Sequence, residues 1–330
     1  MKRFFLYIVT VMCLIFLIPF IFTITFECNK GDNSFNEQVN KKDYISYDYG
    51  KYKTINVLKE DGNIVEMNLD EYLLGVVSAE MPANYDIEAL KAQAVVARTY
   101  TLYTIIHSDK HGDGSICTNS ACCQAWLSKE DRMSKWEEAE REANWNKIKE
   151  AVYSTSGEVI EYNGEVIDAF FHSNSGGKTE VPANVWGGTE YPYLQAVETS
   201  GEDGYTQYSS EVTIGKNEFE SKMREKYSDF QIDWNEEKNI EIVEYTDGGR
   251  VKTIKIGNKN LPGVEVRSIF GLKSANFNIS IENDTIKFSV KGYGHGVGLS
   301  QTGADSMAKQ GANYKDIINH FYTNVQIVSL

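Results

Sequence analysis

The chain has 330 residues, of which 24% are charged and 42% are hydrophobic, a balance typical of a folded globular protein. Its formal net charge of −14 excludes the basic surface that binding to nucleic acid requires. The length allows one large domain or two modest ones.

The N-terminal segment predicts a membrane anchor. Two basic residues in the stub 1–3 precede the uncharged stretch 4–26. As a helix this stretch would be about 34 Å long, enough to span a hydrocarbon core of about 30 Å. The basic stub stays in the cytoplasm, which places the rest outside. A cleavable signal peptide is the alternative, but no small-residue cleavage site follows, so an uncleaved anchor is favoured. The polar segment 27–53 is interpreted as a linker.

The outer domain is predicted to span 54–330 and to begin with two strands around a turn at 61–63. Apolar residues at helical spacing predict a one-faced helix over 69–80. Asp86 is expected to cap a second, alanine-rich helix that runs through Tyr100.

A third helix is predicted to open with a capping box of Ser134 and Glu137 and to run to about Val152. Asn163-Gly164 then predicts a hairpin between Val159–Tyr162 and Glu165–Phe171. Further turns, a short helix and two final helices are expected at 247–249, 283–284, 264–271, 303–309 and 314–322. Helices and antiparallel hairpins without βαβ alternation indicate an α+β fold.

Glu80 is the first candidate for chemistry. It lies at the expected C-terminus of a helix, where the macrodipole disfavours a negative charge. Burial against Met81, Pro82 and Tyr85 would raise its pKa further, as a general acid for glycosidic cleavage requires. Taken alone, a solvated glutamate at a helix end is the commoner explanation.

The second candidate is a metal site in the loop after the alanine-rich helix. His111, Cys117, Cys122 and Cys123 lie within thirteen residues and suit a tetrahedral Zn²⁺ ion. Adjacent side chains diverge, so His107 could replace one of the neighbouring cysteines. A disulfide from Cys117 to one of them is the redox alternative. A closed set of four ligands would make the zinc structural, because no coordination position stays open.

Two glycine-rich polar segments, 171–180 and 292–303, follow predicted strands. Glycine at such places lets the backbone approach a ligand closely, although tight turns at positive φ explain the pattern equally well. Neither segment matches a phosphate-binding loop or a nucleophile elbow.

Four motifs in this order resemble the stage II sporulation protein D family: Ala79-Glu80-Met81-Pro82, Ala92–Tyr100, His172–Gly177 and Gly294–Gln301. The resemblance runs from about Thr54 to Gln326, and the N-terminal anchor fits it as well. It implies a single elongated outer domain.

The resemblance implies a lytic transglycosylase that acts while the forespore is engulfed. Its expected substrate is glycan already stripped of stem peptides by the amidase stage II sporulation protein P, and its products end in 1,6-anhydro-N-acetylmuramic acid. Stage II sporulation protein M is a further expected partner. The expected location is the septal membrane, crossed once, with the C-terminal domain outside the cytoplasm.

The resemblance also assigns roles to residues. Glu80 matches the family's catalytic glutamate and Tyr193 a tyrosine important for activity, while Gln195 replaces a lysine found in some relatives. The zinc ligands of relatives fall on the four loop residues, with Cys122 in place of a histidine. The remaining candidates to hold the glycan strand and orient the acid are His172, Ser173, Ser175, His295 and Gln301.

A hydrolase needs two carboxylates, whereas a transglycosylase can use one. Glu80 would protonate the glycosidic oxygen and then accept the proton of the C6 hydroxyl as that hydroxyl attacks C1. The alternatives are a non-catalytic glycan-binding amidase enhancer and a zinc-dependent cell-wall amidase, although the sequence lacks H-E-x-x-H.

Overall fold

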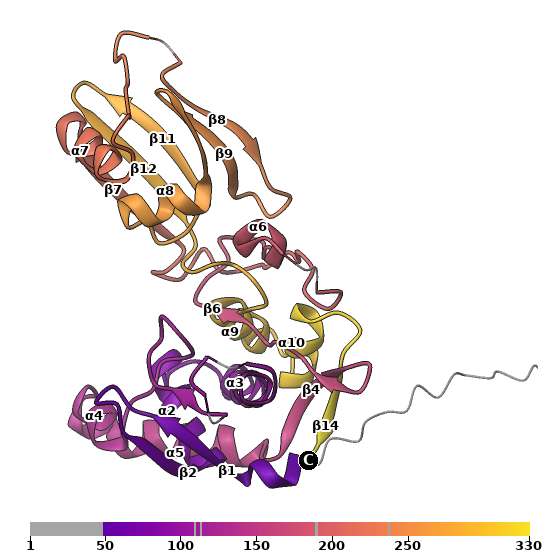
Figure 1. Ribbon diagram of the computed structural model, residues 1–330. Helices are drawn as coiled ribbons and strands as arrows, with labels where there is room; N and C mark the ends of the chain where they lie inside the picture. The colour runs from indigo at the N-terminus through magenta and orange to yellow at the C-terminus, as the bar shows by residue number, and fades with distance from the viewer. Residues whose placement is uncertain (1–48, 109, 113, 189–190, 237) are drawn as a thin grey trace, which may run out of the picture. The chain divides into compact units, whose positions relative to one another are not determined.

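The computed structural model describes residues 49–108, 110–112, 114–188, 191–236 and 238–330 (Figure 1). The predicted stub, the anchor at 4–26 and most of the linker lie outside these ranges. Within them, no helix combines the length and the apolar character needed to cross a bilayer. The described residues mix helices with small sheets, as an α+β fold requires, and they belong to one compact unit.

The folded part begins before residue 54. A 3₁₀ helix, η1 (Tyr49–Lys53), precedes the first strand. The ring of Tyr49 is buried in the core, and its hydroxyl donates to Oε1 of Glu161 at 3.2 Å. These contacts explain why the C-terminal end of the predicted linker belongs to the domain.

The first predicted strands and helices are confirmed. Asn68 caps the first helix by accepting hydrogen bonds from the backbone of Asp70 and Glu71, and Asp86 caps the second by accepting from Glu88. The second helix extends beyond Tyr100 and is buried along most of its length. These elements are β1 (Thr54–Leu58), β2 (Ile64–Asn68), α2 (Leu69–Glu80) and α3 (Ile87–His107).

The predicted start of the third helix at Ser134 is wrong. Ser134 is the last residue of a short helix, α4 (Lys129–Ser134), and its hydroxyl donates backward to the carbonyl of Asp131 at 2.8 Å. Ser128 caps α4 instead. The capping serine therefore belongs to the short helix that precedes the predicted one. After a 3₁₀ turn, η2 (Glu138–Glu140), the long helix α5 runs over Arg141–Ser154.

The hairpin at Asn163-Gly164 is confirmed, with φ of 53° and 82° at the two turn residues. Its strands are β4 (Glu158–Tyr162) and β5 (Glu165–Val166), and β14 (Gln326–Ser329) pairs with the other edge of β4. The second strand is shorter than predicted, because the backbone N–H of Asp168 donates to the hydroxyl of Tyr193 instead of to a neighbouring strand.

Two short strand pairs are parallel, which the sequence did not predict. Strand β1 pairs with β3 (Ile116–Cys117), and β6 (Phe171–His172) pairs with β13 (Leu299–Ser300). The second pair joins the two glycine-rich segments, so motifs far apart in the sequence lie side by side.

Residues 209–291, which we call the insert, build a hydrophobic core of their own. The predicted turns at 247–249 and 283–284 each join an antiparallel pair. Ser209 pairs with Lys291, so the chain enters and leaves the insert at neighbouring positions. Its elements are β7 (Ser209–Gly215), α7 (Lys216–Lys226), β8 (Ile240–Tyr245), β9 (Val251–Ile256), β10 (Lys259–Pro262), α8 (Gly263–Phe270), β11 (Phe277–Glu282) and β12 (Thr285–Lys291). The strands form two sheets, with the orders β10-β9-β8 and β11-β12-β7.

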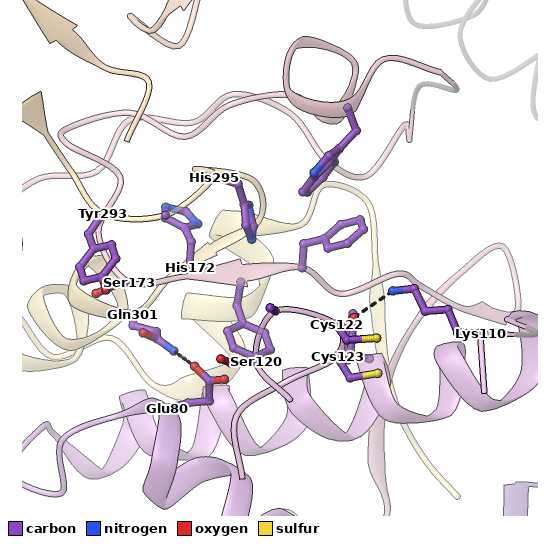
Figure 2. A pocket seen from close by; sticks show the side chains of 16 residues that line it. Glu80, Lys110, Ser120, Cys122, Cys123, His172, Ser173, Tyr293, His295 and Gln301 are labelled. Atoms are coloured by element: carbon purple, nitrogen blue, oxygen red, sulfur yellow. Dashed lines mark hydrogen bonds between the residues drawn. The ribbon is translucent and has the colours of Figure 1, made fainter. Parts of the chain in front are cut away.

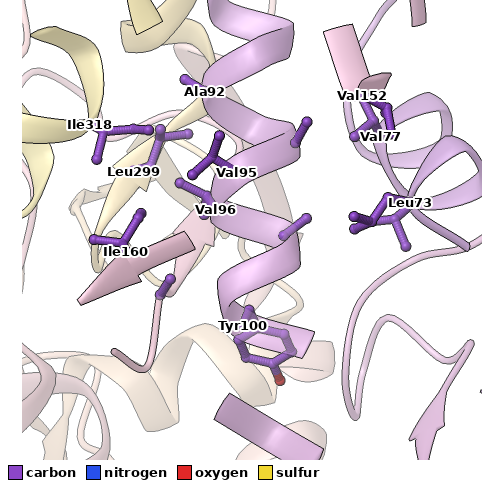
Figure 3. Close-up of a cluster of buried hydrophobic side chains, with 14 of the residues drawn as sticks. Leu73, Val77, Ala92, Val95, Val96, Tyr100, Val152, Ile160, Leu299 and Ile318 are labelled. Atoms are coloured by element: carbon purple, nitrogen blue, oxygen red, sulfur yellow. The ribbon is translucent and has the colours of Figure 1, made fainter. Parts of the chain in front are cut away.

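The other core is built around α3, against which helices from both ends of the described chain pack (Figure 3). After the insert the chain returns through α9 (Gln301–Lys309) and α10 (Tyr314–Phe321), as predicted. Apolar side chains from six elements meet there: Leu73, Val77, Ala92, Val95, Val96, Tyr100, Val152, Ile160, Leu299 and Ile318. This packing holds Gln301, the first residue of α9, beside the end of α2.

Candidate active site

A cleft of about 620 Å³ lies where α2 ends and where the two glycine-rich segments meet (Figure 2). Of the residues that line it, Glu80 is the carboxylate and Lys110 the amino cation. The lining residues are Glu80, Tyr100, Lys110, Ser120, Ala121, Cys122, Cys123, Phe170, Phe171, His172, Ser173, Trp186, Tyr293, Gly294, His295 and Gln301.

Glu80 is the last residue of α2 and is held at both carboxylate oxygens. Oε1 accepts the backbone N–H of Ala125 at 2.7 Å, and Oε2 accepts the side-chain amide of Gln301 at 3.4 Å (Figure 2). Burial raises the pKa of Glu80, and these two hydrogen bonds, which favour the ionised form, offset only part of that effect. A fixed carboxyl group with a raised pKa keeps its proton to higher pH than an ordinary carboxyl group does, which suits it to donate a proton and take one back.

Residues 117–126 form what we call the metal-side wall of the cleft. Its three cysteines come together with His111, as predicted: one ligand atom each of His111, Cys117, Cys122 and Cys123 lies within 4.8 Å of the others. Nε2 of His111 is 3.3 Å from Sγ of Cys123 and 3.5 Å from Sγ of Cys122. The three cysteines are free thiols, so the disulfide alternative is not what the structure has.

This group fits a single metal ion. Thiolate and imidazole ligands bind Zn²⁺ at about 2.0–2.3 Å, and four atoms packed this closely can surround one centre. His107, the predicted substitute ligand, instead packs its ring against Tyr103 with 4.7 Å between the ring centroids.

The same loop also positions Glu80, because Ala125 lies only two residues after Cys123. The side chain of Gln124 donates to the hydroxyls of Thr101 and Tyr72, at 2.7 and 3.2 Å. Trp126 lies against Gly75 of α2, where a Cβ atom would come within 2.3 Å of the indole nitrogen. The metal-side wall is therefore attached to both helices that flank Glu80.

Four rings form what we call the aromatic wall: Phe170, His172, Trp186 and His295. The ring centroids of His172 and His295 are 5.6 Å apart (Figure 2). Val297 fixes both tautomers, since its carbonyl oxygen is 3.1 Å from Nδ1 of His172 and its N–H donates to Nδ1 of His295 at 3.0 Å. Nδ1 of His172 therefore carries a proton and Nδ1 of His295 does not.

Both histidines are neutral at physiological pH. Burial, followed by the nearby Arg250, lowers the pKa of His172 to about 3. Burial and the neighbouring His172 lower the pKa of His295 well below its ordinary value. The aromatic wall therefore presents uncharged groups to the cleft.

A buried carboxylate, Glu202, joins the two glycine-rich segments behind the aromatic wall. We call Glu202 and its partners Ser175, Thr199, Ser300 and Thr302 the carboxylate knot. The four hydroxyls and the backbone N–H groups of Ser175 and Gly177 donate to its two oxygens. Burial alone would raise the pKa of Glu202, but these hydrogen bonds outweigh it and hold the pKa below its ordinary value of 4.5.

Arg250 extends from the insert to the same two segments. Its guanidinium is buried and donates to the carbonyls of Ser175 and Lys178, at 3.0 and 3.1 Å. A Cβ atom at Gly296 would lie 2.0 Å from this guanidinium, so the glycine permits the close approach. The insert thus contributes directly to the position of the aromatic wall.

The structure brings most of the predicted site residues to one cleft, which Glu80, His172, Ser173, His295 and Gln301 line together with two of the metal ligands. The other three candidates lie elsewhere: Tyr193 is buried with its hydroxyl on the backbone of Asp168, Ser175 belongs to the carboxylate knot, and Gln195 is exposed outside the cleft. Sequence reasoning missed Trp186, Glu202 and Arg250, which belong to no spaced motif.

The site and fold define a class of protein with one buried carboxyl group in a cleft and a group of possible metal ligands beside it. A family described as SpoIID, Stage II sporulation protein, matches residues 59–162. Stage II sporulation protein D of Bacillus subtilis is 35% identical over 278 residues, which cover 84% of this chain and 77% of that protein. Its counterpart in Bacillus amyloliquefaciens is 32% identical and covers 95% and 92% of the two chains.

The chain belongs to the stage II sporulation protein D family, a family of sporulation proteins. It is also similar to the amidase enhancer of Bacillus subtilis, at 28% identity over 78% of this chain and 40% of that protein.

Proposed function

We propose that this protein is a peptidoglycan lytic transglycosylase in which Glu80 is the sole acid and base. The observation that carries the proposal is the state of Glu80: a cleft carboxyl whose pKa is raised by burial and whose two oxygens are both held. Among the residues lining the cleft there is no second carboxylate, which a hydrolase would require.

In the proposed reaction the protonated Glu80 donates its proton to the glycosidic oxygen, and the bond from that oxygen to C1 of the N-acetylmuramic acid breaks. The C6 hydroxyl of the same sugar forms a new bond to C1 and gives its proton to Glu80. The enzyme returns to its starting state, no water is consumed, and the product carries a 1,6-anhydro ring.

The metal ligands support a structural Zn²⁺ ion as part of this proposal. His111, Cys117, Cys122 and Cys123 would supply four ligands, which leaves no open position for a catalytic water. The ion would hold the loop that carries Ala125, and through it the hydrogen bond to Glu80.

Substrate, partners and location follow from the family resemblance. We propose glycan stripped of its stem peptides as the substrate, with the stage II sporulation proteins P and M as partners during engulfment. The stretch 4–26 would anchor the chain in the septal membrane, with the catalytic domain outside the cytoplasm.

Two observations favour other functions. The similarity to an amidase enhancer supports a binding module without catalysis. Asp168 supports a hydrolase with two carboxyl groups, because burial raises its pKa to about 7 although Lys110 opposes the shift. Asp168 does not line the cleft, which argues against its taking part in the reaction.

Digestion of peptide-stripped glycan by the full-length chain, followed by mass spectrometry, tests these functions. We expect anhydro-ended fragments, a loss of roughly 10²–10⁴-fold in rate for Glu80→Gln, and unchanged product chemistry for Asp168→Asn. Cleavage by Glu80→Gln at the wild-type rate would contradict the assignment. Reducing ends in place of anhydro ends would establish a hydrolase, and no cleavage by the wild type would favour the enhancer.

A further inference from the structure

Trp186 is a large apolar side chain that the fold leaves partly exposed to solvent. It is the last residue of α6 (Pro182–Trp186), and the next residue, Gly187, leaves the helix at a φ of 70°. The side chain is 51% exposed although it lines the cleft. The hydrophobic core therefore does not account for its position.

The indole of Trp186 is supported by other rings. Its centroid lies 4.7 Å from that of Phe170 and 5.0 Å from that of His295, with interplanar angles of 37° and 51°. These spacings are those of favourable aromatic pairs. The side chain is consequently held in place by its neighbours while about half of it faces solvent, which prepares a flat apolar surface for a ligand.

The surroundings of this surface are uncharged. His172 and His295 are neutral, and Phe170 completes the wall. A ligand on such a surface should combine a flat apolar face with polar groups at its rim, because the rest of the cleft offers hydroxyls, the amide of Gln301 and the charged groups of Glu80 and Lys110. The ring of a sugar has this chemistry, with C–H groups on its faces and hydroxyls at its edge.

We propose that Trp186 is the stacking platform of a saccharide subsite, on which one pyranose ring of the glycan lies with its C–H face against the indole. Phe170 and His295 act as positioning residues that hold the indole. This inference rests on the proposed function for its choice of a glycan, and it adds a binding residue that belongs to none of the motifs described above.

Binding of non-cleaved oligosaccharides to the full-length Glu80→Gln variant tests the subsite separately from catalysis. The probes are tetra-N-acetylchitotetraose (chitotetraose below), which carries N-acetyl groups, and cellotetraose, which lacks them, and binding is measured by calorimetry and tryptophan fluorescence. Trp186→Ala in this background should weaken chitotetraose binding at least tenfold. Trp186→Phe, which keeps a flat ring, should stay within about threefold while losing most of the ligand-induced fluorescence change.

Tyr153→Ala is the matched control, because Tyr153 is 46% exposed on α5 and does not line the cleft. Its binding should equal that of the Glu80→Gln background, and thermal unfolding checks that every variant is folded. Equal binding of both sugars would mean that the protein recognises the pyranose ring, and tighter binding of chitotetraose would mean that it also recognises the N-acetyl group. Both outcomes support the subsite. Unchanged binding in a folded Trp186→Ala variant overturns it, as does the absence of binding to either sugar, whatever the cleavage assay shows.

Discussion

The two walls of the cleft are fixed by different chemistry. The metal-side wall is a loop held by four possible metal ligands and by Trp126 against Gly75 of α2. The aromatic wall is held by the carboxylate knot around Glu202 and by Arg250 from the insert. One hydrogen bond to Glu80 comes from Ala125 in the metal-side wall, and the other comes from Gln301, which directly follows Ser300 of the carboxylate knot.

This difference means that the position of Glu80 depends on two kinds of solution condition. Thiolate ligands respond to metal supply and oxidation, whereas a buried hydrogen-bonded carboxylate responds to acid. Variants that weaken one wall and spare the other should therefore separate these dependences.

Loss of the carboxylate knot should have the largest effect. Glu202→Ala removes the acceptor that four hydroxyls and two backbone N–H groups share in a buried region, which should cost about 3–5 kcal/mol of unfolding free energy. Urea denaturation measures the loss. Glu211→Ala is the control, because its exposed pair with Lys287 should contribute about 1 kcal/mol or less. Similar losses for the two variants would contradict a structural role for the knot.

The knot also makes a prediction about acid stability. The folded-state pKa of Glu202 lies below its ordinary value of 4.5, so its contribution is fully present above that value and is lost as the pH falls through the lower folded-state value. The unfolding free energy of the wild type should fall in this range more steeply than that of Glu202→Ala. Parallel pH curves for the two proteins would be inconsistent with this origin of the shift.

Breaking the metal-side wall should come next. Cys117→Ser removes one thiolate from the group of four, and we expect at least a tenfold weaker affinity for Zn²⁺ together with a lower melting temperature in the metal-loaded protein. Ser120→Ala changes the same loop without touching a ligand and should retain both. The zinc content of both proteins is measured after dialysis. A metal site would be excluded if the wild type and Cys117→Ser retained equally little zinc.

A smaller effect is expected at the contact between the loop and α2. Gly75→Ala would place a Cβ atom 2.3 Å from the indole nitrogen of Trp126, and relief of this overlap should cost about 1–3 kcal/mol. Movement of the loop should also lower kcat through Ala125. At Gly204 the same substitution meets no atom within 4 Å and should be nearly neutral. A wild-type kcat in Gly75→Ala would mean that the contact does not position Glu80.

The smallest expected effect is a shift of the pH profile. Gln301 favours the ionised form of Glu80, so Gln301→Leu should raise the pKa of Glu80 further. Because Glu80 must be protonated to donate, the alkaline limb of kcat/KM against pH should move to higher pH. Gln310→Leu changes the residue that follows the same helix, whose amide donates to Ser306, and should leave the limb in place. A shift to lower pH for Gln301→Leu would show that the hydrogen bond does not act on the acid.

Local signals predicted the parts of the fold that short segments determine. Asn163-Gly164 specifies its turn, Asp86 caps its helix, and helical spacing placed Glu80 at a helix end. The capping prediction at Ser134 was wrong because Ser134 ends the short helix α4, which Ser128 caps, and the long helix α5 begins without a side-chain cap. Local sequence chemistry could not choose between the two serines.

The rest of the site depends on contacts between distant segments. The parallel pairing of β6 with β13, the donors around Glu202, and the approach of Arg250 to Gly296 each join residues without any fixed spacing. Trp186 is an isolated aromatic residue in the sequence, and only its support by neighbouring rings distinguishes it.

The hydrogen bond between Glu80 and Gln301 spans 221 residues of chain and has a consequence for folding. The ribosome completes the helix that ends in Glu80 long before it adds Gln301, and the whole insert is made in between. Contacts of such high sequence separation form slowly, since a long loop must close first. Glu80 can therefore gain its contact with Gln301 only after most of the chain has been made, so a nascent chain carries Glu80 before its cleft is complete.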